Sequence, residues 1–380
     1  MIEGSGAEGI TRHPRRIMIV SNGYGEDLIG AKLGGAFKTI APDITIAPLP
    51  LIGTGAAYQA SHFIPEMTSP IPRSGGFIRT PRDVIGDLQG GILSTLWKQR
   101  REIQAHSNAA DAIIAVGDVF CLMWATSGMH RPTVFLPTAK SDLFMPHSAL
   151  EYFLIRRRAD WIFTRDTVTA DAFGQQGIDA QFLGNPMMDG LLDSTPLNRP
   201  PSSVTLALLP GSRTECYGNL DRILQVLPLI PSALPIWGWI CQSPQVDHRE
   251  LSRVLTAHGY INSNGHWTHP NGTLTLELTL RFSSAVQASD CVIGLAGTAN
   301  EQAAWLGKPV IAFPGTGPQS RPLRFIEQQQ LIGPRLHYIQ SSTPKDIATA
   351  VIHALSLPPL SPPAPQNAAH AIAGHVLPLI

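Results

Sequence analysis

Short apolar segments recur along this chain of 380 residues, and each ends in glycine-rich or polar residues before a helical pattern begins. The first, residues 17–20, leads into a polar loop at 21–27 and a helical pattern at 28–40. Further segments of this kind lie at residues 44–47, 112–116, 133–136, 161–164 and 181–183. Apolar strands that alternate with helices form parallel sheets covered on both faces. The first half is therefore predicted to be a doubly wound α/β domain.

The same order of elements restarts after a polar, proline-rich stretch at residues 193–203. The predicted strands of the second half are residues 204–209, 235–240, 273–278, 291–294 and 310–313, and its helices are residues 220–229, 283–289 and 299–306. We therefore expect an α/β fold with two Rossmann-like doubly wound domains that face a cleft. The predicted divisions are an N-terminal Rossmann-like domain (1–195), a C-terminal Rossmann-like domain (196–350) and a C-terminal helix and tail (351–380).

Charge and composition exclude several classes of protein. Lysine plus arginine (28) equals aspartate plus glutamate (28), which argues against binding to nucleic acid. The four cysteines have no CxxC spacing and the histidines no ligand spacing, so no metal and no cofactor are expected. No apolar run approaches the roughly 18–20 residues that span a bilayer, and we expect no signal peptide. A cytoplasmic protein is predicted, with contact to the inner face of the membrane left open, as is its oligomeric state.

Two segments of the second half have the composition of a phosphate site. The strand at 204–209 ends in Pro210-Gly211-Ser212-Arg213, which offers backbone N–H groups, a hydroxyl and a guanidinium to a diphosphate. The strand at 291–294 leads through glycine into a helix whose first amides are free to meet phosphate. The expected donor-binding residues are Gly211, Ser212, Arg213, Gly297, Thr298, Ala299, Asn300, Glu301 and Gln302, of which Glu301 or Gln302 would bind the ribose hydroxyls. Ordinary turns and close helix packing are the alternative explanations.

Four segments, in this order, resemble lipid-A-disaccharide synthase. They are Gly-Tyr-Gly-Glu-Asp at 23–27, Leu-Gly-Asn-Pro-Met-Met-Asp at 183–189, Leu-Leu-Pro-Gly-Ser-Arg at 208–213 and Ala-Gly-Thr-Ala-Asn-Glu-Gln at 296–302. The resemblance implies a GT-B fold, a UDP-sugar donor, inverting transfer and a lipid acceptor at a membrane. It also implies that the domain of residues 1–195 lies on the acceptor side and that the domain of residues 196–350 binds the nucleotide sugar.

The chain departs from that family at three places. The family's first loop is usually Gly-Glu-x-Ser-Gly-Asp, and only its trailing acidic position is retained in Gly-Tyr-Gly-Glu-Asp. A glutamate of the family corresponds to Gln302, with Glu301 one residue earlier. The family's Ser-Val-Trp-Ala-Trp stretch is replaced by residues 137–142. The resemblance therefore indicates a related protein whose acceptor differs.

Transfer to a hydroxyl with inversion needs a base near the attacking oxygen. Asp118, at a predicted strand end, occupies the place of an acidic residue of that family and is the first candidate; Glu26 and Asp27 are the second. All three are also placed to cap or stabilise a helix start. Gly23 and Gly25 form the glycine loop on the acceptor side.

Two further segments have a predicted role. Asn185, before Pro186, is a candidate contact for the donor diphosphate, and a simple Asn-Pro turn is an equal explanation. Residues 75–101 mix apolar and basic side chains, so we expect either peripheral membrane contact or an ordinary domain helix.

Three functions fit this pattern. The first is a hexosyltransferase that moves sugar from a UDP-sugar to an acceptor hydroxyl, on a lipid, by direct inverting displacement. The alternatives are a UDP-sugar 2-epimerase, which would need acid and base groups around the donor, and a non-catalytic nucleotide-sugar-binding protein, in which Asp118 would be replaceable.

Overall fold

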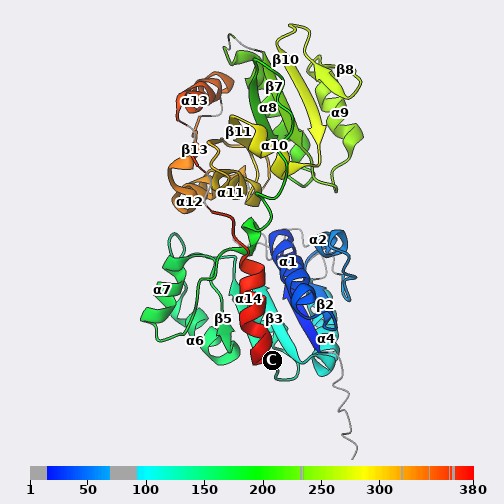
Figure 1. Cartoon of the computed structure of the whole chain (residues 1–380), viewed down its shortest axis with the longest axis vertical. Coiled ribbons are helices and arrows are strands. Elements are labelled where there is room, and N and C mark those ends of the chain that lie inside the picture. Colours follow the sequence, from blue (N-terminus) through cyan, green and yellow to red (C-terminus); the bar gives the residue numbers. More distant parts are fainter. Residues whose placement is uncertain are drawn as a thin grey trace, which may run out of the picture. The chain divides into compact units, whose positions relative to one another are not determined.

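The computed structural model describes residues 15–68 and 92–380, apart from residues 232, 234, 318, 319, 342, 359, 362 and 363. It divides into two compact units, which Figure 1 shows coloured along the sequence. Unit 1 comprises Met1–Met187 and Asn367–Ile380, and unit 2 comprises Met188–Gln366.

Unit 1 is built on a five-stranded sheet in the order β2-β1-β3-β4-β5, in which every neighbouring pair is parallel. Its strands are β1 (Arg16–Ser21), β2 (Thr45–Pro50), β3 (Ala112–Gly117), β4 (Thr133–Pro137) and β5 (Trp161–Ile162). Its helices are α1 (Tyr24–Ile40), α2 (Ala56–Ala60), α4 (Ile92–Ala109), α5 (Val119–Ala125), α6 (Ala149–Arg158), α7 (Thr167–Gln175) and α14 (Ala368–Val376).

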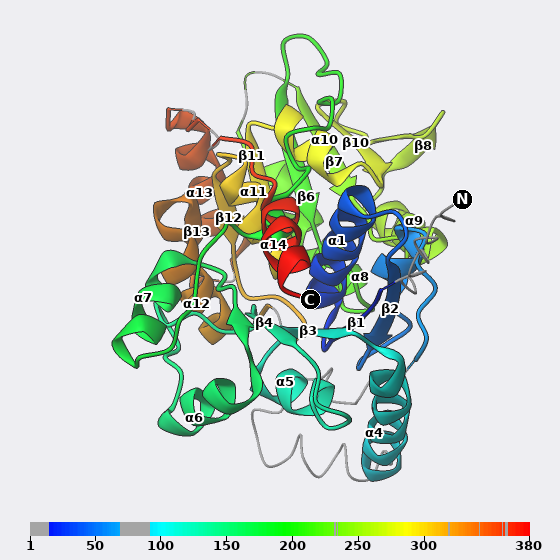
Figure 2. The same ribbon diagram turned by 60° about the horizontal axis from the view of Figure 1, so that its bottom comes forward.

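Two apolar layers cover the faces of this sheet. Ile17 and Ile19 of β1 pack in the layer that contains residues of α1 and α14. Met18 and Val20 pack in the other layer, with residues of α4, α5 and α6. Figure 2 shows α1 and α14 on one side of the strands and α4, α5 and α6 on the other. Because both faces are buried, the strands are apolar throughout rather than alternating, which is why the sequence shows them clearly.

The last helix, α14, belongs to unit 1, although α13 (Pro344–Ser356) before it belongs to unit 2. Ala369, Ile372 and Val376 of α14 are buried in the layer beside α1, and Arg15 Nη1 donates a hydrogen bond to the Leu377 carbonyl oxygen at 3.0 Å. The segment 351–380, predicted as one C-terminal piece, is thus shared by the two units.

Unit 2 contains an eight-stranded sheet in the order β13-β12-β11-β6-β7-β10-β9-β8. Its strands are β6 (Val204–Leu209), β7 (Ile236–Cys241), β8 (Ile261–Ser263), β9 (His266–Thr268), β10 (Leu274–Thr279), β11 (Cys291–Gly294), β12 (Val310–Ala312) and β13 (Leu336–Tyr338). Its helices are α8 (Cys216–Val226), α9 (His248–Ala257), α10 (Phe282–Ala288), α11 (Thr298–Trp305), α12 (Pro322–Ile332) and α13. The hairpin β8–β9 is antiparallel, and the other neighbouring pairs are parallel except β10–β9.

The units divide eight residues before the predicted boundary at 195/196. Met188 and Leu191 are buried in the core of unit 2, and Leu197 N donates to the Ser284 carbonyl oxygen at 3.1 Å. The polar stretch at 193–203 is therefore a surface segment of unit 2. The strand predicted at 181–183 is reduced to a single bridge between Phe163 and Gln181.

Removing the buried side chain of Ile372 tests whether α14 is part of the core of unit 1. Ile372 is 1% exposed, so Ile372→Ala is expected to lower the free energy of unfolding by about 2–5 kcal/mol. The exposed His370 on the same helix supplies the control His370→Ala, which should change it by less than about 0.5 kcal/mol. If urea denaturation shows that both substitutions lower the free energy of unfolding equally, the assignment of α14 to the core of unit 1 is contradicted.

Candidate functional site

In unit 1 the loops after β1 and β3 leave neighbouring strands in opposite directions. The chain passes from β1 outward to β2, and from β3 outward to β4. Open α/β sheets bind ligands at such a switch point, beyond the carboxyl ends of the strands. The loop after β1 carries Asn22 and Gly23, and the loop after β3 carries Asp118. The structure thus brings these loops to one edge of the sheet.

Asp118 joins the two loops. Its Oδ1 accepts hydrogen bonds from Asn22 Nδ2 at 2.7 Å and from Cys121 N at 2.9 Å. The bond from Cys121 makes Asp118 the N-cap residue of α5, and the bond from Asn22 connects it to the loop after β1. Burial raises the pKa of its carboxyl above the ordinary value, and the hydrogen bonds from Cys121 and Asn22 oppose that shift. Both the capping role and the position at the switch point therefore apply to the same carboxylate.

Gly117 makes the contact between Asn22 and Asp118 possible. Its φ is +146°, a conformation that L side chains rarely adopt, and a Cβ on it would lie 1.9 Å from Asn22 Oδ1. Any larger residue at this position would push Asn22 away from Asp118.

Asp27 lies behind the loop in the interior of unit 1 rather than on its surface. Asp27 is only 1% exposed, and its Oδ1 accepts a hydrogen bond from Ser21 Oγ at 2.6 Å. Ser21 Oγ also lies 2.9 Å from the hydroxyl of the buried Tyr58. The pKa of Asp27 is raised to about 7, chiefly by burial; the hydrogen bond from Ser21 opposes this shift and the nearby Glu26 adds to it. Asp27 therefore changes its charge near neutral pH.

The rest of the glycine loop forms the start of α1. Gly23 is the N-cap residue in an extended conformation, and its carbonyl oxygen accepts from Asp27 N at 2.8 Å. Gly25 and Glu26 lie in the first helical turn, where the helix dipole favours a negative side chain. Glu26 and Asp27 are the second candidates for the base, and of these two Glu26 is partly exposed.

The raised pKa of Asp27 predicts a pH-dependent stability. The carboxyl binds its proton more tightly folded than unfolded, so its contribution is present below about pH 4 and is lost as the pH rises through about 7. Wild type should therefore lose stability relative to Asp27→Asn between pH 5 and pH 8. The melting temperatures of the two proteins are measured across that range. If both change with pH in the same way, the raised pKa of the buried Asp27 carboxyl is contradicted.

In unit 2 the corresponding switch point lies between β6 and β11. The chain passes from β6 outward to β7, and from β11 outward to β12. The loop after β6 is Pro210-Gly211-Ser212-Arg213, and the loop after β11 leads into α11. The two segments predicted to bind the donor are thus neighbours at one sheet edge. Gly211 has a φ of +116°, which requires glycine; Ser212 is exposed and Arg213 is half-buried.

The start of α11 has the features of an anion site only in part. Its N-cap residue, Gly297, provides no side-chain cap for the amides of the first turn, which begins with Thr298 and Ala299. Asn300, however, is 0% exposed, and its Nδ2 donates to the Gly294 carbonyl oxygen at 3.1 Å. This bond attaches Asn300 to the end of β11, and its contact with the donor stays a prediction. Glu301 and Gln302 follow in the helix and are 8% and 7% exposed.

Two buried side chains that the sequence analysis missed, Asn219 and Ser320, tie three loops of unit 2 together. Asn219 Nδ2 donates to the Pro210 carbonyl oxygen at 2.9 Å, and its Oδ1 accepts from Thr316 N at 2.7 Å. Ser320 Oγ, which follows the loop after β12, donates to the Leu295 carbonyl oxygen at 2.8 Å. The sequence signal that could have indicated this loop is the run Gly315-Thr316-Gly317, which follows an apolar strand.

Asn185 has the geometry of a turn. Its Oδ1 accepts a hydrogen bond from Met187 N at 3.0 Å, which fixes the Asn-Pro-Met segment at the end of the first part of unit 1. A polar cluster for which no role was predicted follows β4, where Asp142 Oδ1 accepts from Tyr152 OH at 3.0 Å and Asp142 Oδ2 lies 2.7 Å from His147 Nδ1. This cluster holds the loop after β4. The first residue of that loop, Thr138, donates its backbone N–H to the Gly117 carbonyl oxygen.

Within the described ranges, no group of three or more His, Cys, Asp or Glu side chains is arranged to hold a metal ion. No described helix is long and apolar enough to cross a membrane. Of the predicted membrane-contact segment, residues 75–91 lie outside the described residues, and residues 92–101 belong to α4. In α4, Trp97 is 64% exposed and Arg101 lies over its ring at 4.8 Å.

No family model matches this chain, and no curated protein matches it. Solved structures do resemble it over nearly its whole length. S. aureus MnaA, in a structure with UDP, is 13% identical, with a TM-score of 0.59 over 96% of this chain and 98% of that one. The UDP-GlcNAc 2-epimerase from Methanocaldococcus jannaschii is 13% identical, with a TM-score of 0.57 over 96% and 100%.

The glycosyltransferase of kitacinnamycin is 14% identical to this chain, with a TM-score of 0.57 over 96% of this chain and 94% of that one. Together these similarities confirm the predicted fold class, an α/β protein with two Rossmann-like doubly wound domains of the GT-B type. At this level of identity they establish the fold, and the specific likeness to lipid-A-disaccharide synthase stays a prediction.

Proposed function

We propose that this protein is a hexosyltransferase that moves sugar from a UDP-sugar to a hydroxyl of a lipid acceptor by direct inverting displacement. The observation that carries the proposal is the switch point of unit 2, where the loop of Gly211, Ser212 and Arg213 adjoins the start of α11. Backbone amides at a helix start together with a guanidinium suit a diphosphate. Two proteins of similar fold, S. aureus MnaA in a structure with UDP and a UDP-GlcNAc 2-epimerase, support uridine as the nucleoside.

The chemistry divides between the two units. In unit 2, Arg213 and the first amides of α11 would stabilise the negative charge that develops on the diphosphate as its bond to the sugar breaks. In unit 1, the carboxylate of Asp118 would take the proton of the acceptor hydroxyl while that oxygen bonds to the anomeric carbon. The raised pKa of Asp118 makes it a stronger base than an ordinary surface aspartate. One displacement of this kind inverts the anomeric centre and needs neither a covalent intermediate nor a metal, so activity should persist in EDTA.

The lipid acceptor and membrane contact rest on the resemblance in the sequence and on the exposed Trp97 beside basic residues in α4. An exposed indole next to basic side chains suits a membrane interface. Peripheral attachment at the cytoplasmic face is proposed on that basis.

Arg213→Ala tests the donor site. UDP should raise the melting temperature of wild type by mass action, and loss of a charge-assisted contact should weaken UDP binding about tenfold or more. Arg253 on α9, whose side chain is 74% exposed and paired with Glu250, supplies the control Arg253→Ala. Calorimetry should find UDP affinity unchanged in that control. If UDP binds neither wild type nor control, or binds Arg213→Ala equally well, the donor assignment fails.

Asp118→Asn tests the base separately from the fold, because asparagine also caps helices. We expect kcat to fall about 100-fold or more while UDP affinity stays the same. Asp166, the N-cap of α7 that accepts from Thr169 N, supplies the matched control Asp166→Asn. Full activity of Asp118→Asn would point to Glu26 as the base, and absence of turnover in wild type with every UDP-sugar and lipid extract tried would favour a non-catalytic binding protein.

A UDP-sugar 2-epimerase is the second candidate, because an enzyme of that class has the same fold over 96% of this chain. Inversion at C2 breaks the C2–H bond, so an epimerase would convert UDP-sugar without an acceptor and incorporate deuterium at C2 in D2O. A transferase would release UDP only when an acceptor is present. Mass spectrometry of UDP-sugars incubated with the enzyme in D2O separates the two.

A further inference from the structure

Three buried side chains of unit 2 donate hydrogen bonds to backbone carbonyl oxygens at the carboxyl ends of its strands. They are Asn219 on α8, Ser320 just before α12 and Gln328 on α12, and none of them is more than 1% exposed. The loops that they contact are the two at the switch point, residues 210–213 after β6 and residues 295–297 after β11.

Gln328 binds the turn that leads from β11 into α11. Its Nε2 donates to the Gly297 carbonyl oxygen at 3.0 Å and lies 3.5 Å from that of Ala296. Its Oε1 accepts from Asn300 Nδ2 at 3.4 Å, so the Nε2 end of the amide faces the turn. A side chain from a different helix thus holds the first peptide units of α11.

Ser320 and Asn219 bind the same two loops in the same manner. Ser320 Oγ donates to the Leu295 carbonyl oxygen at 2.8 Å, and Asn219 Nδ2 donates to that of Pro210 at 2.9 Å. The two loops lie against each other, because a Cβ on Gly211 would be 4.0 Å from the Leu295 carbonyl oxygen. The three side chains therefore support one continuous stretch of the sheet edge.

Holding a carbonyl oxygen also determines where the next N–H group points, because the two are opposed across a planar trans peptide. The N–H groups that follow the three held carbonyls belong to Gly211, Ala296 and Thr298, so they point away from the buried side chains. Within the part of the chain that the structure describes, none of the three has a hydrogen-bond acceptor.

A buried carbonyl oxygen needs a partner in any case, and that need alone is a structural reason for such bonds. It does not require the opposed N–H groups to gather at one place. Here all three lie on the two loops of the switch point, where outward N–H groups at a helix start suit an anion.

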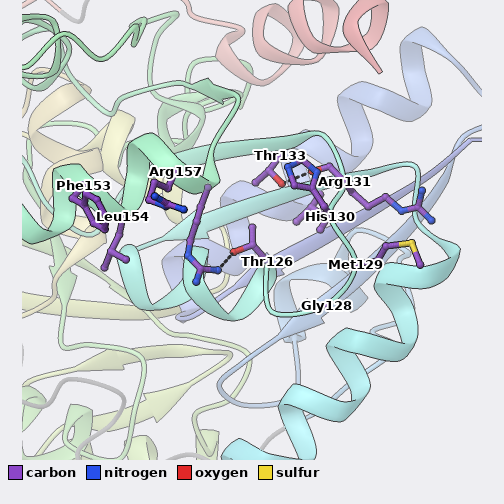
Figure 3. Close-up of a pocket in the computed structure, with 11 residues that line it drawn as sticks. Thr126, Gly128, Met129, His130, Arg131, Thr133, Phe153, Leu154 and Arg157 are labelled. Carbon is purple, nitrogen blue, oxygen red and sulfur yellow. Dashed lines mark hydrogen bonds between the residues drawn. The ribbon is translucent and has the colours of Figure 1, made fainter.

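Side chains that donate to carbonyl oxygens in unit 1 have a different effect. Arg131 donates to the carbonyl oxygens of Ser107 and Asn108 near the end of α4, at 3.2 and 3.0 Å. Figure 3 shows Arg131 across a pocket from Arg157. The N–H groups of the peptide units that Arg131 contacts lie inside α4, so its bonds cap a helix and turn no N–H group outward.

We propose that Gln328, together with Ser320 and Asn219, is a positioning residue of the donor site. These side chains do not touch the donor and act by orienting the N–H groups of Gly211, Ala296 and Thr298 toward its diphosphate. Donors that are already oriented need no rearrangement when charge develops on the leaving group. The proposal rests on the proposed function and deepens it, because it names what fixes the diphosphate site.

Gln328→Met tests the proposal, since methionine keeps the length of the side chain and removes the amide. Gln287→Met is the matched control. Gln287 on α10 also uses its Nε2 to hold two carbonyl oxygens of unit 2, those of Leu191 and Ser194, at 2.8 and 3.0 Å. Those two carbonyls lie outside the switch point.

Calorimetric titration with UDP and with uridine separates orientation of the N–H groups from general loss of structure. UDP affinity should fall about tenfold in Gln328→Met, because bonds to a charged group are weakened, while uridine affinity stays that of wild type. Uridine has no phosphate, so damage to the whole unit would lower both affinities. Neither affinity should change in Gln287→Met.

Ser320→Ala provides a second, smaller substitution in case Gln328→Met does not fold. Its matched control is Ser289→Ala, because Ser289 is also 1% exposed and its Oγ donates to the Val286 carbonyl oxygen at 2.8 Å, before β11. UDP affinity should fall about fivefold in Ser320→Ala, with uridine affinity unchanged, and should stay the same in Ser289→Ala.

The positioning role is overturned if the affinities for UDP and uridine fall together, or if a control loses as much UDP affinity as its partner. It is also overturned if Gln328→Met and Ser320→Ala bind UDP as wild type does; the donor site then stands if Arg213→Ala still weakens UDP binding. If wild type binds UDP no more tightly than uridine, the donor site itself fails, and the positioning role fails with it.

Discussion

The chemistry available to this protein depends on how two parallel strands end. At Gly117 and at Gly211 the backbone has φ values of +146° and +116°, which side-chain-bearing residues rarely adopt. Each glycine turns the chain away from its sheet, so that Asp118 follows at one switch point and Ser212 and Arg213 follow at the other. Strand order alone provides an edge where loops diverge, and these two backbone conformations place functional groups at it.

Buried polar groups hold both edges in place. In unit 1, the chain of Asp27, Ser21 and Tyr58 lies beneath the glycine loop, and in unit 2, Asn219 connects the loops after β6 and β12. A buried polar side chain costs free energy unless it is hydrogen-bonded, so such groups define one arrangement of the loops attached to them. Rigid support of this kind lets a site act on developing charge without first reorganising.

Sequence patterns located the buried strands well and the tertiary contacts poorly. The segments 204–209 and 291–294 were predicted with the bounds that β6 and β11 have, because central strands are apolar on both faces and end in glycine or proline. The edge hairpin β8–β9 and the return of α14 to unit 1 gave no such signal. Asn219 and Thr316 are 97 residues apart, and the inward bond of Asn300 depends on its orientation in α11, so neither could be read from local sequence.

Hydrogen–deuterium exchange of the protein with and without UDP tests the central claim most directly. If the switch point of unit 2 binds the donor, UDP should slow exchange in the peptides that cover residues 210–213 and 294–302, and leave the peptides that cover α6 of unit 1 unchanged. Protection confined to unit 1, or no change in either loop of unit 2 at a UDP concentration that raises the melting temperature, would contradict the account.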